Sequence, residues 1–155
     1  ASGVFYHGNA ERLEEFLPQM KYDLVYSFGV IHHSVNPKKI LSQVAKYMTN
    51  ESVLKVMVYA DNSYKRMMID AGIDRPEAQN GCPIANTYTL EGVQKLFEDF
   101  QINSINQDHI FPYQIEPYYR GEYVKTPWFD AMPENIFRAL EKSLGWHYLI
   151  DAKLK

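Results

Sequence analysis

Apolar and polar positions along the chain predict strands and helices in alternation. Residues 22–30 (YDLVYSFGV) are rich in β-forming residues and carry apolar side chains on both faces, which is typical of a buried parallel strand. Pro37 then stands where a helix begins. The apolar residues that follow it at helical spacing are Ile40, Leu41, Val44 and Met48. A second apolar run at residues 52–59 completes a strand–helix–strand unit, which we expect to be parallel and right-handed.

The rest of the chain continues this alternation. We expect a helix at residues 63–71, a helix that Thr89 caps and that carries apolar residues to Phe100, and a helix at residues 133–144. Strands are expected at residues 101–111 and 146–154. Alternating strands and helices place the chain in the α/β class.

Two further segments have local signals. A short β-prone run at residues 4–7 precedes Asn9, which is placed to cap a short helical stretch that Pro18 ends. Gly, Pro and Asn residues predict a loop at residues 74–86.

Residues 112–128 are crowded with aromatic side chains, and three prolines exclude a long regular element there. The aromatic residues are Tyr113, Tyr118, Tyr119, Tyr123 and Trp128. No repeat, low-complexity tract or Gly/Ser linker divides the sequence. We therefore expect one domain over residues 1–155, with an aromatic-rich insertion at about 111–132.

Composition narrows the possible environments and partners. The 155 residues are 46% hydrophobic, which is enough for a real core. Sixteen Lys+Arg against nineteen Asp+Glu give a net charge of −3, which disfavours binding to nucleic acid or to an anionic membrane surface. No apolar run approaches the length of a membrane-spanning helix, and the single cysteine, Cys82, cannot form an internal disulfide. These features predict a soluble, cytoplasmic protein.

The first residues, Ala1-Ser2-Gly3-Val4, include neither an initiator Met nor the basic-then-apolar order of a signal peptide. We expect a start that results from cutting or processing.

Two segments together resemble the class I S-adenosylmethionine-dependent methyltransferases, in particular the broad group that acts on small molecules. Residues 8–13 read GNAERL, similar to the family pattern G-D-A-E-x-L. Residues 22–33 read YDLVYSFGVIHH, similar to F-D-L-V-x-S-x-x-V-L-H-H. In this sequence, as in the family pattern, a Pro-initiated helix and an apolar strand follow the second segment. The resemblance covers residues 4–59 well and the remainder in outline.

The resemblance implies a Rossmann-like sheet in the order 3-2-1-4-5-7-6, with only the seventh strand antiparallel. The chain would supply the end of the third strand and the fourth through seventh strands. The first two strands would be absent, together with the glycine-rich turn that faces the cofactor, and no Gly-x-Gly-x-Gly pattern occurs in the sequence. The strand at residues 22–30 would then have an open edge, which a missing amino-terminal half or a partner chain must cover.

The resemblance also implies a binding site for S-adenosyl-L-methionine. Asn9 and Ala10 match the pair that holds adenine, and Asn keeps the acceptor oxygen of the usual Asp. The alternative is that Asn9 only caps a helix. Ser27, Phe28 and Gly29 end the central strand, where backbone groups would meet the methionine portion of the cofactor.

The adjacent pair His32-His33 allows three interpretations: metal ligands, a general base or structural hydrogen bonding. The other histidines and Cys82 follow no usual ligand spacing, so we expect no metal. An imidazole with a pKa of about 6.5 suits proton removal from an oxygen or nitrogen acceptor near neutral pH. We favour His33 for this catalytic role, with His32 as the second candidate.

The methyl acceptor is expected to contact aromatic side chains with polar tips, which suit a sugar, a phenol or another polar ring. The candidates are Tyr59, Tyr113, Tyr119, Arg120 and Trp128, with Gly81-Cys82-Pro83 as a second wall opposite Tyr59. The alternative for each aromatic residue is that it packs the insertion onto the sheet.

The leading hypothesis is therefore the carboxyl-terminal part of a methyltransferase that acts on an oxygen or nitrogen of a small molecule. The alternative is a non-catalytic, methyltransferase-like interaction module whose open strand edge another chain covers. A dehydrogenase or other nucleotide-binding α/β enzyme is disfavoured, because the sequence lacks a glycine-rich phosphate-binding turn.

Overall fold

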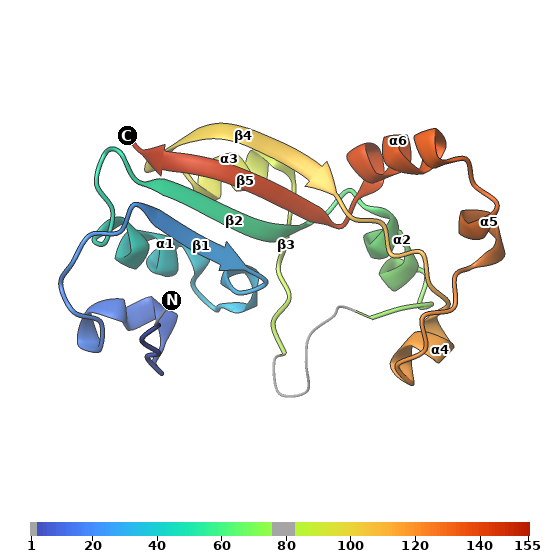
Figure 1. Cartoon of the computed structure of the whole chain (residues 1–155), viewed down its shortest axis with the longest axis horizontal. Helices are drawn as coiled ribbons and strands as arrows, with labels where there is room; N and C mark the ends of the chain where they lie inside the picture. Colours follow the sequence, from blue (N-terminus) through green and yellow to red (C-terminus); the bar gives the residue numbers. More distant parts are fainter. Residues whose placement is uncertain (1–2, 76–82) are drawn as a thin grey trace.

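The computed structural model describes residues 3–75 and 83–155, and its centre is a five-stranded sheet (Figure 1). The strands are β1 (Leu24–Phe28), β2 (Val53–Ala60), β3 (Thr87–Tyr88), β4 (Phe100–Asp108) and β5 (His147–Leu154). Their order is β1-β2-β5-β4, with the short β3 beside the end of β2. β1 and β2 are parallel, and β5 is antiparallel to both of its neighbours. This is the order expected for the fourth, fifth, seventh and sixth strands, with the seventh antiparallel.

The helices mostly follow the predicted positions. Two short 3-10 helices are η1 (Ala10–Glu15) and η2 (Ile31–His33). The α-helices are α1 (Pro37–Ala45), α2 (Tyr64–Asp70), α3 (Leu90–Leu96), α4 (Ile115–Tyr119), α5 (Pro127–Asp130) and α6 (Glu134–Leu144). The predicted caps are present, because Asn9 Oδ1 accepts from Glu11 N at 2.9 Å and Thr89 Oγ1 accepts from Gly92 N at 3.0 Å. In Figure 1, α2, α4, α5 and α6 lie beyond one end of the sheet.

The main core lies on one face of the sheet, beneath α1 and α3. Leu41 of α1, Leu54 and Val58 of β2, Val93 of α3 and Ile150 of β5 are buried together there. Burying such side chains contributes on the order of 2 kcal/mol each. The sheet is therefore held to its helices on this side.

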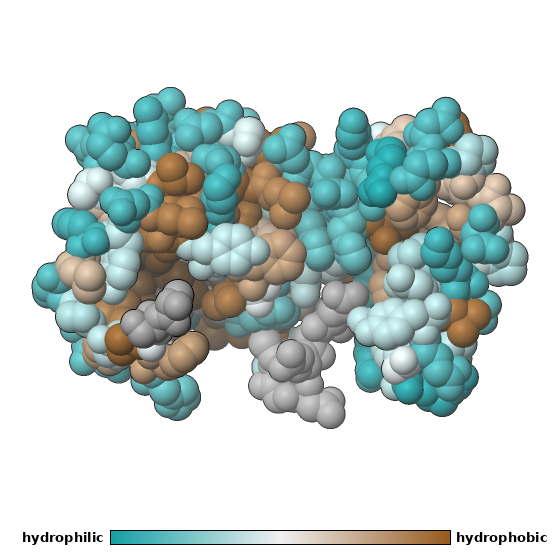
Figure 2. Space-filling model, in the orientation of Figure 1, coloured by the Kyte–Doolittle hydropathy of each residue, from teal (hydrophilic) through white to brown (hydrophobic). Residues whose placement is uncertain are grey.

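The opposite face of β1 is open, and the prediction of a strand buried on both faces was wrong. Leu24, Tyr26 and Phe28 are 55%, 64% and 48% exposed, whereas Val25, pointing the other way, packs against the core. Figure 2 shows apolar side chains gathered over the sheet on this side. No helix among the described residues covers these three side chains.

The expected end of a third strand at residues 4–7 is absent. Val4 and Phe5 are 77% and 97% exposed and lie in irregular backbone. A β-prone run becomes a strand only where a neighbouring strand supplies hydrogen bonds, and no described strand lies beside it. β3 was not predicted, because two residues are too few to show a period.

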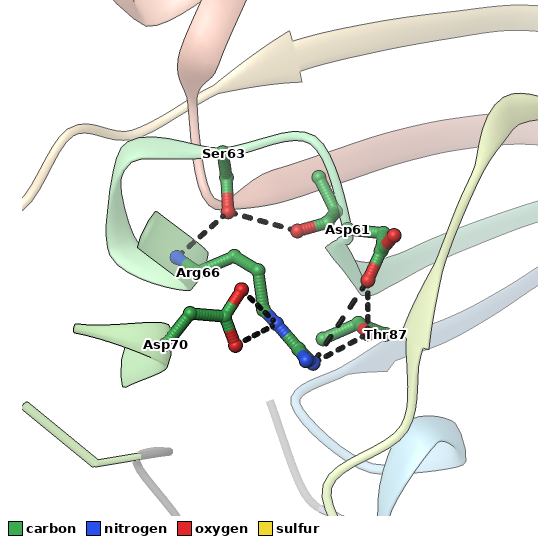
Figure 3. Close-up of polar contacts among 6 residues, drawn as sticks. Asp61, Ser63, Arg66, Asp70 and Thr87 are labelled. Carbon is green, nitrogen blue, oxygen red and sulfur yellow. Dashed lines mark hydrogen bonds and ion pairs between the residues drawn. The ribbon is translucent and has the colours of Figure 1, made fainter. Parts of the chain in front are cut away.

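The turn after β2 is fixed by a polar network that joins three elements (Figure 3). The buried Ser63 hydroxyl donates to Ala60 O at 2.9 Å and accepts from Arg66 N at 3.2 Å, which caps α2. Thr87 of β3 donates to Asp61 Oδ1 at 2.8 Å, and the Arg66 guanidinium lies 3.9 Å from the same oxygen. The direction in which α2 leaves the sheet is thereby set.

Replacing Ser63 tests this turn. Ser63→Ala removes a helix cap and leaves the Ala60 carbonyl without that donor, so we expect the free energy of unfolding to fall by about 1–2 kcal/mol. Ser42→Ala is the matched control, because the Ser42 hydroxyl bonds to Lys39 O at an exposed position. Urea denaturation compares the two variants, and an equal loss in both would contradict this role of Ser63.

Candidate functional site

Several of the candidate site residues lie along the edge of the sheet that is formed by the carboxyl ends of the parallel strands. This edge is distinct from the open side of β1, where a neighbouring strand could pair. β1 and β2 end at this edge, and β5, being antiparallel, begins at it. The register places Tyr59 of β2 directly opposite His147 of β5. Trp146 precedes β5 and is 1% exposed. Ligands of open α/β sheets bind at the carboxyl ends of parallel strands, so this is the edge where a site is expected.

Imidazole and aromatic rings pack against one another along this edge. Tyr59 is 4% exposed, and its ring centroid lies 3.9 Å from that of His32 and 4.3 Å from that of Trp146. His109, which follows β4, stacks on His147 at 4.5 Å. We call this set the ring cluster; its members are His32, His33, Tyr59, His109, Trp146 and His147.

His33 is held in one tautomer. Its Nδ1 lies 2.6 Å from the carbonyl oxygen of Ile84. Because a carbonyl oxygen only accepts, Nδ1 must carry the proton, which leaves Nε2 of the neutral ring as a proton acceptor. The ring is half-buried, with its centroid 4.2 Å from that of His32. This arrangement is suited to a general base.

His32 and His147 are held neutral. Burial and, to a smaller extent, the neighbouring His33 lower the pKa of His32 to about 4. Burial also lowers the pKa of His147 to about 3, with smaller contributions from His109 and His32. Neither ring carries a charge near neutral pH.

Three buried polar groups near this edge have no hydrogen-bond partner among the described residues. They are the ring nitrogens of His32, the indole nitrogen of Trp146 and the hydroxyl of Ser27. His32 and Trp146 contact the same ring, that of Tyr59. Buried polar groups are nearly always hydrogen-bonded, so these groups are exceptions, and they lie at the edge where a site is expected.

Gly29 leaves the carboxyl end of β1 open to close approach. Its φ of +75° is a conformation that favours glycine, and an added Cβ would meet only Met57 Cε, at 4.0 Å. A ligand could therefore approach the backbone here without meeting a side chain from residue 29.

The segment that holds Asn9 and Ala10 is tied to the same edge through Glu11. The Glu11 carboxylate accepts from Ser34 Oγ at 2.5 Å and from Asn36 N at 3.2 Å, in the loop after η2. The bond from Ser34 is the largest cause of a lowered pKa at Glu11. Asn9 itself is exposed, and the structure thus brings Asn9 and Ala10 to the loop that follows the end of β1.

The residues predicted to contact the methyl acceptor lie in separate parts of the structure. Tyr113 and Trp128 line a cavity of about 400 Å³ beside α2, α4 and α5. Tyr119 and Arg120 do not line it: Tyr119 donates to Asp74 at 2.9 Å, and Arg120 pairs with Glu122 at 3.3 Å. Tyr59 belongs to the ring cluster. Of the second wall, Gly81 and Cys82 lie outside the described residues.

His109, Trp146 and His147 were not predicted as site residues. The expected antiparallel direction of the last strand could have indicated them, since its first residues lie where the parallel strands end.

Within residues 3–75 and 83–155, no three His, Cys, Asp or Glu side chains gather as metal ligands. In the same ranges, no helix is long and apolar enough to cross a membrane.

Comparison with known proteins is informative for the fold. No family model matches the sequence, and no curated protein matches it. A SAM-dependent methyltransferase from Thermotoga maritima matches 99% of the chain with a TM-score of 0.58 at 17% identity. The chain has the methyltransferase fold. The mitomycin 7-O-methyltransferase (TM-score 0.54) and the magnesium protoporphyrin IX methyltransferase from Synechocystis (0.51) each match 96% of it at 12% identity.

This methyltransferase-fold chain spans only part of the matched structures. It covers 65% of the Thermotoga protein, 49% of the Synechocystis protein and 33% of the mitomycin enzyme. The matched part accounts for almost the whole of this chain, so the larger proteins contain substantial further structure.

The lowered pKa values of His32 and His147 predict a loss of stability in mild acid. Their pKa values in the folded state lie below the unfolded value near 6.5, so the unfolded chain binds protons that the native state excludes. Stability is full above pH 6.5 and declines as the pH falls, by about 1–2 kcal/mol per histidine at pH 5. His147→Phe should flatten the decline, measured by urea denaturation from pH 7 to 5.

The matched control is His7→Gln, because His7 is exposed outside the sheet. This variant should keep the pH dependence of the unmodified chain. A stability that stays constant between pH 7 and pH 5, or an equal flattening by both variants, would contradict the assignment of the pH dependence to His32 and His147.

Proposed function

We propose that the chain is the carboxyl-terminal part of an S-adenosylmethionine-dependent methyltransferase that acts on an oxygen or nitrogen of a small molecule. The supporting observation is the methyltransferase strand order, together with the hydrogen bond from Ser34 to Glu11, which ties the segment that holds Asn9-Ala10 to the loop after η2. Ser27–Gly29 and His33 lie at and just after the end of β1. Two matched structures are methyltransferases of small molecules, mitomycin and magnesium protoporphyrin IX.

The open side of β1 supports a longer parent chain. An unpaired apolar strand edge templates aggregation, and proteins normally cover it. Tyr26 and Phe28 are exposed on the open face beside that edge. We infer that two preceding strands complete the sheet: one of them, which carries the glycine-rich turn, pairs with β1, and the other lies beyond it. The alternative is that another chain covers the edge and the domain serves as an interaction module.

The residues present fit the cofactor. The Asn9 side-chain oxygen would accept from the adenine amine while it caps η1, because it has two lone pairs. The Ala10 N–H would donate to an adenine ring nitrogen. The backbone at Ser27–Gly29 would face the methionine portion, next to the unpaired Ser27 hydroxyl. S-adenosylmethionine, when bound, supplies a methyl group on a positively charged sulfur.

His33 would take the proton from the acceptor at Nε2. The Ile84 carbonyl keeps the proton on Nδ1 and would stabilise the imidazolium that forms. His32, which is fully buried, cannot reach an acceptor and would position His33 through their ring contact. Methyl transfer is an in-line displacement, so holding the acceptor in place and excluding water account for much of the catalysis.

Gly29 tests the cofactor site. In the longest protein that the reading frame encodes, Gly29→Ala should weaken S-adenosylhomocysteine binding at least about tenfold, because a methyl group and a strained φ intrude where the ligand approaches. Gly72→Ala is the matched control: Gly72 also has a positive φ (+70°) and open space around it, but it ends α2. Isothermal titration calorimetry measures both affinities.

The same titration separates the two functions. If the longer protein binds S-adenosylhomocysteine and residues 1–155 alone do not, the chain is part of a methyltransferase. If the longest encoded protein folds and does not bind the ligand, the enzyme proposal fails and the interaction module is favoured.

A further inference from the structure

The cavity beside α2 has the size of a small-molecule site. Its volume is about 400 Å³, within the range of roughly 300–1,000 Å³ typical of ligand pockets. Its walls come from α2, from the segment that runs from Phe111 through α4, and from α5. Its apolar and aromatic lining is Tyr64, Met68, Ile73, Phe111, Tyr113, Ile115, Pro117, Trp128 and Phe129.

Two walls of the cavity grow from the edge that carries the ring cluster. Tyr64 lies four residues after the end of β2, and Phe111 lies three residues after the end of β4. β4 and β2 are both antiparallel to β5, so they end at the same edge. Two walls of the cavity are thus built by segments that leave the edge of the sheet where the ring cluster lies.

The aromatic rings of the cavity include two whose polar groups are already engaged. Tyr64 and Trp128 share a side-chain hydrogen bond, in which the indole N–H must donate to the phenol oxygen. Burial raises the pKa of Tyr64, and this bond opposes the shift, so the phenol stays neutral. The cavity therefore offers neutral ring surfaces, whose π-faces attract cations.

The only charged side chain that lines the cavity, among the described residues, is Glu116. It forms no ion pair with any described residue. The charges nearby are largely compensated: Lys65 pairs with the buried Asp74 at 2.5 Å, and Arg120 pairs with Glu122.

Two more cationic side chains, Arg75 and Lys125, lie near the cavity but do not line it. The Arg75 guanidinium lies 4.3 Å from the centroid of the Tyr119 ring, and Lys125 belongs to the segment that bridges to Tyr113.

The Lys65 ammonium lies 5.0 Å from the ring centroid of Phe111, a lining residue, but its charge is balanced by Asp74. Among the described lining residues, the charge presented to a ligand is therefore the negative charge of Glu116.

We propose that this cavity binds a protonated amine carried on an aromatic or other apolar group. The apolar group would occupy the ring-lined interior, and the ammonium would lie between the ring faces and the Glu116 carboxylate. An anionic ligand would be repelled by Glu116, and a neutral one would lack the attraction of an ammonium to the carboxylate and the ring faces. Binding of the amine does not depend on the proposed function. Only the further role of the amine as methyl acceptor rests on it.

Three probes of matched size test the proposal at pH 7: phenethylamine, a cation; 2-phenylethanol, neutral; and phenylacetate, an anion. Titration calorimetry on the 155-residue chain should show phenethylamine binding at least about tenfold more tightly than 2-phenylethanol, and phenylacetate more weakly than either. Glu116→Gln should weaken phenethylamine binding about five- to tenfold and leave 2-phenylethanol unchanged. Glu122→Gln is the control, because Glu122 is acidic, close in sequence and outside the cavity lining.

The outcomes are decisive. Absence of phenethylamine binding, equal affinity for the amine and the alcohol, or equal effects of Glu116→Gln and Glu122→Gln would each overturn the proposal. Glu116 is exposed, so Glu116→Gln should fold normally. A separate titration of S-adenosylhomocysteine into the longer protein distinguishes the amine site from the proposed methyltransferase function. Amine binding without cofactor binding would overturn only the proposed function.

Discussion

The insertion of β5 between β2 and β4 is the constraint on which the rest of the structure depends. Because β5 is antiparallel, its start lies where β2 ends, and Trp146 covers Tyr59 there. The backbone fixes this junction: Ala60 N donates to Trp146 O, and Trp146 N donates to His109 O, each at 2.7 Å. A parallel strand in that place would begin at the opposite edge and leave Tyr59 uncovered.

The protonation states at this edge are consistent with the proposed chemistry. Burial keeps His32 and His147 neutral, while the Ile84 carbonyl fixes the tautomer of His33. The edge therefore holds a ring, that of His33, whose Nε2 is available as a proton acceptor, and His32 and His147 beside it carry no charge that would repel the resulting imidazolium. The packing that stabilises the sheet also prepares the candidate base.

Local sequence signals predicted most of the elements, because caps and periodicity are short-range properties. Asn9 and Thr89 cap the helices that the sequence assigned to them, and α1 and β2 lie where apolar spacing placed them. The failures depend on tertiary context. Whether residues 4–7 pair, and whether Tyr26 is covered, depends on neighbouring strands that a local pattern cannot reveal. The meeting of His109 with His147 likewise depends on the direction of β5.

The central claim is that the open side of β1 is where the remainder of a methyltransferase joins this chain and completes a cofactor site. A crystal structure of the longest encoded protein with S-adenosylhomocysteine tests it most directly. The account predicts a parallel strand hydrogen-bonded to β1, with the ligand against Asn9-Ala10 and Ser27–Gly29 at the carboxyl ends of the strands. A β1 edge covered by a different element, or a ligand bound away from these residues, would contradict it.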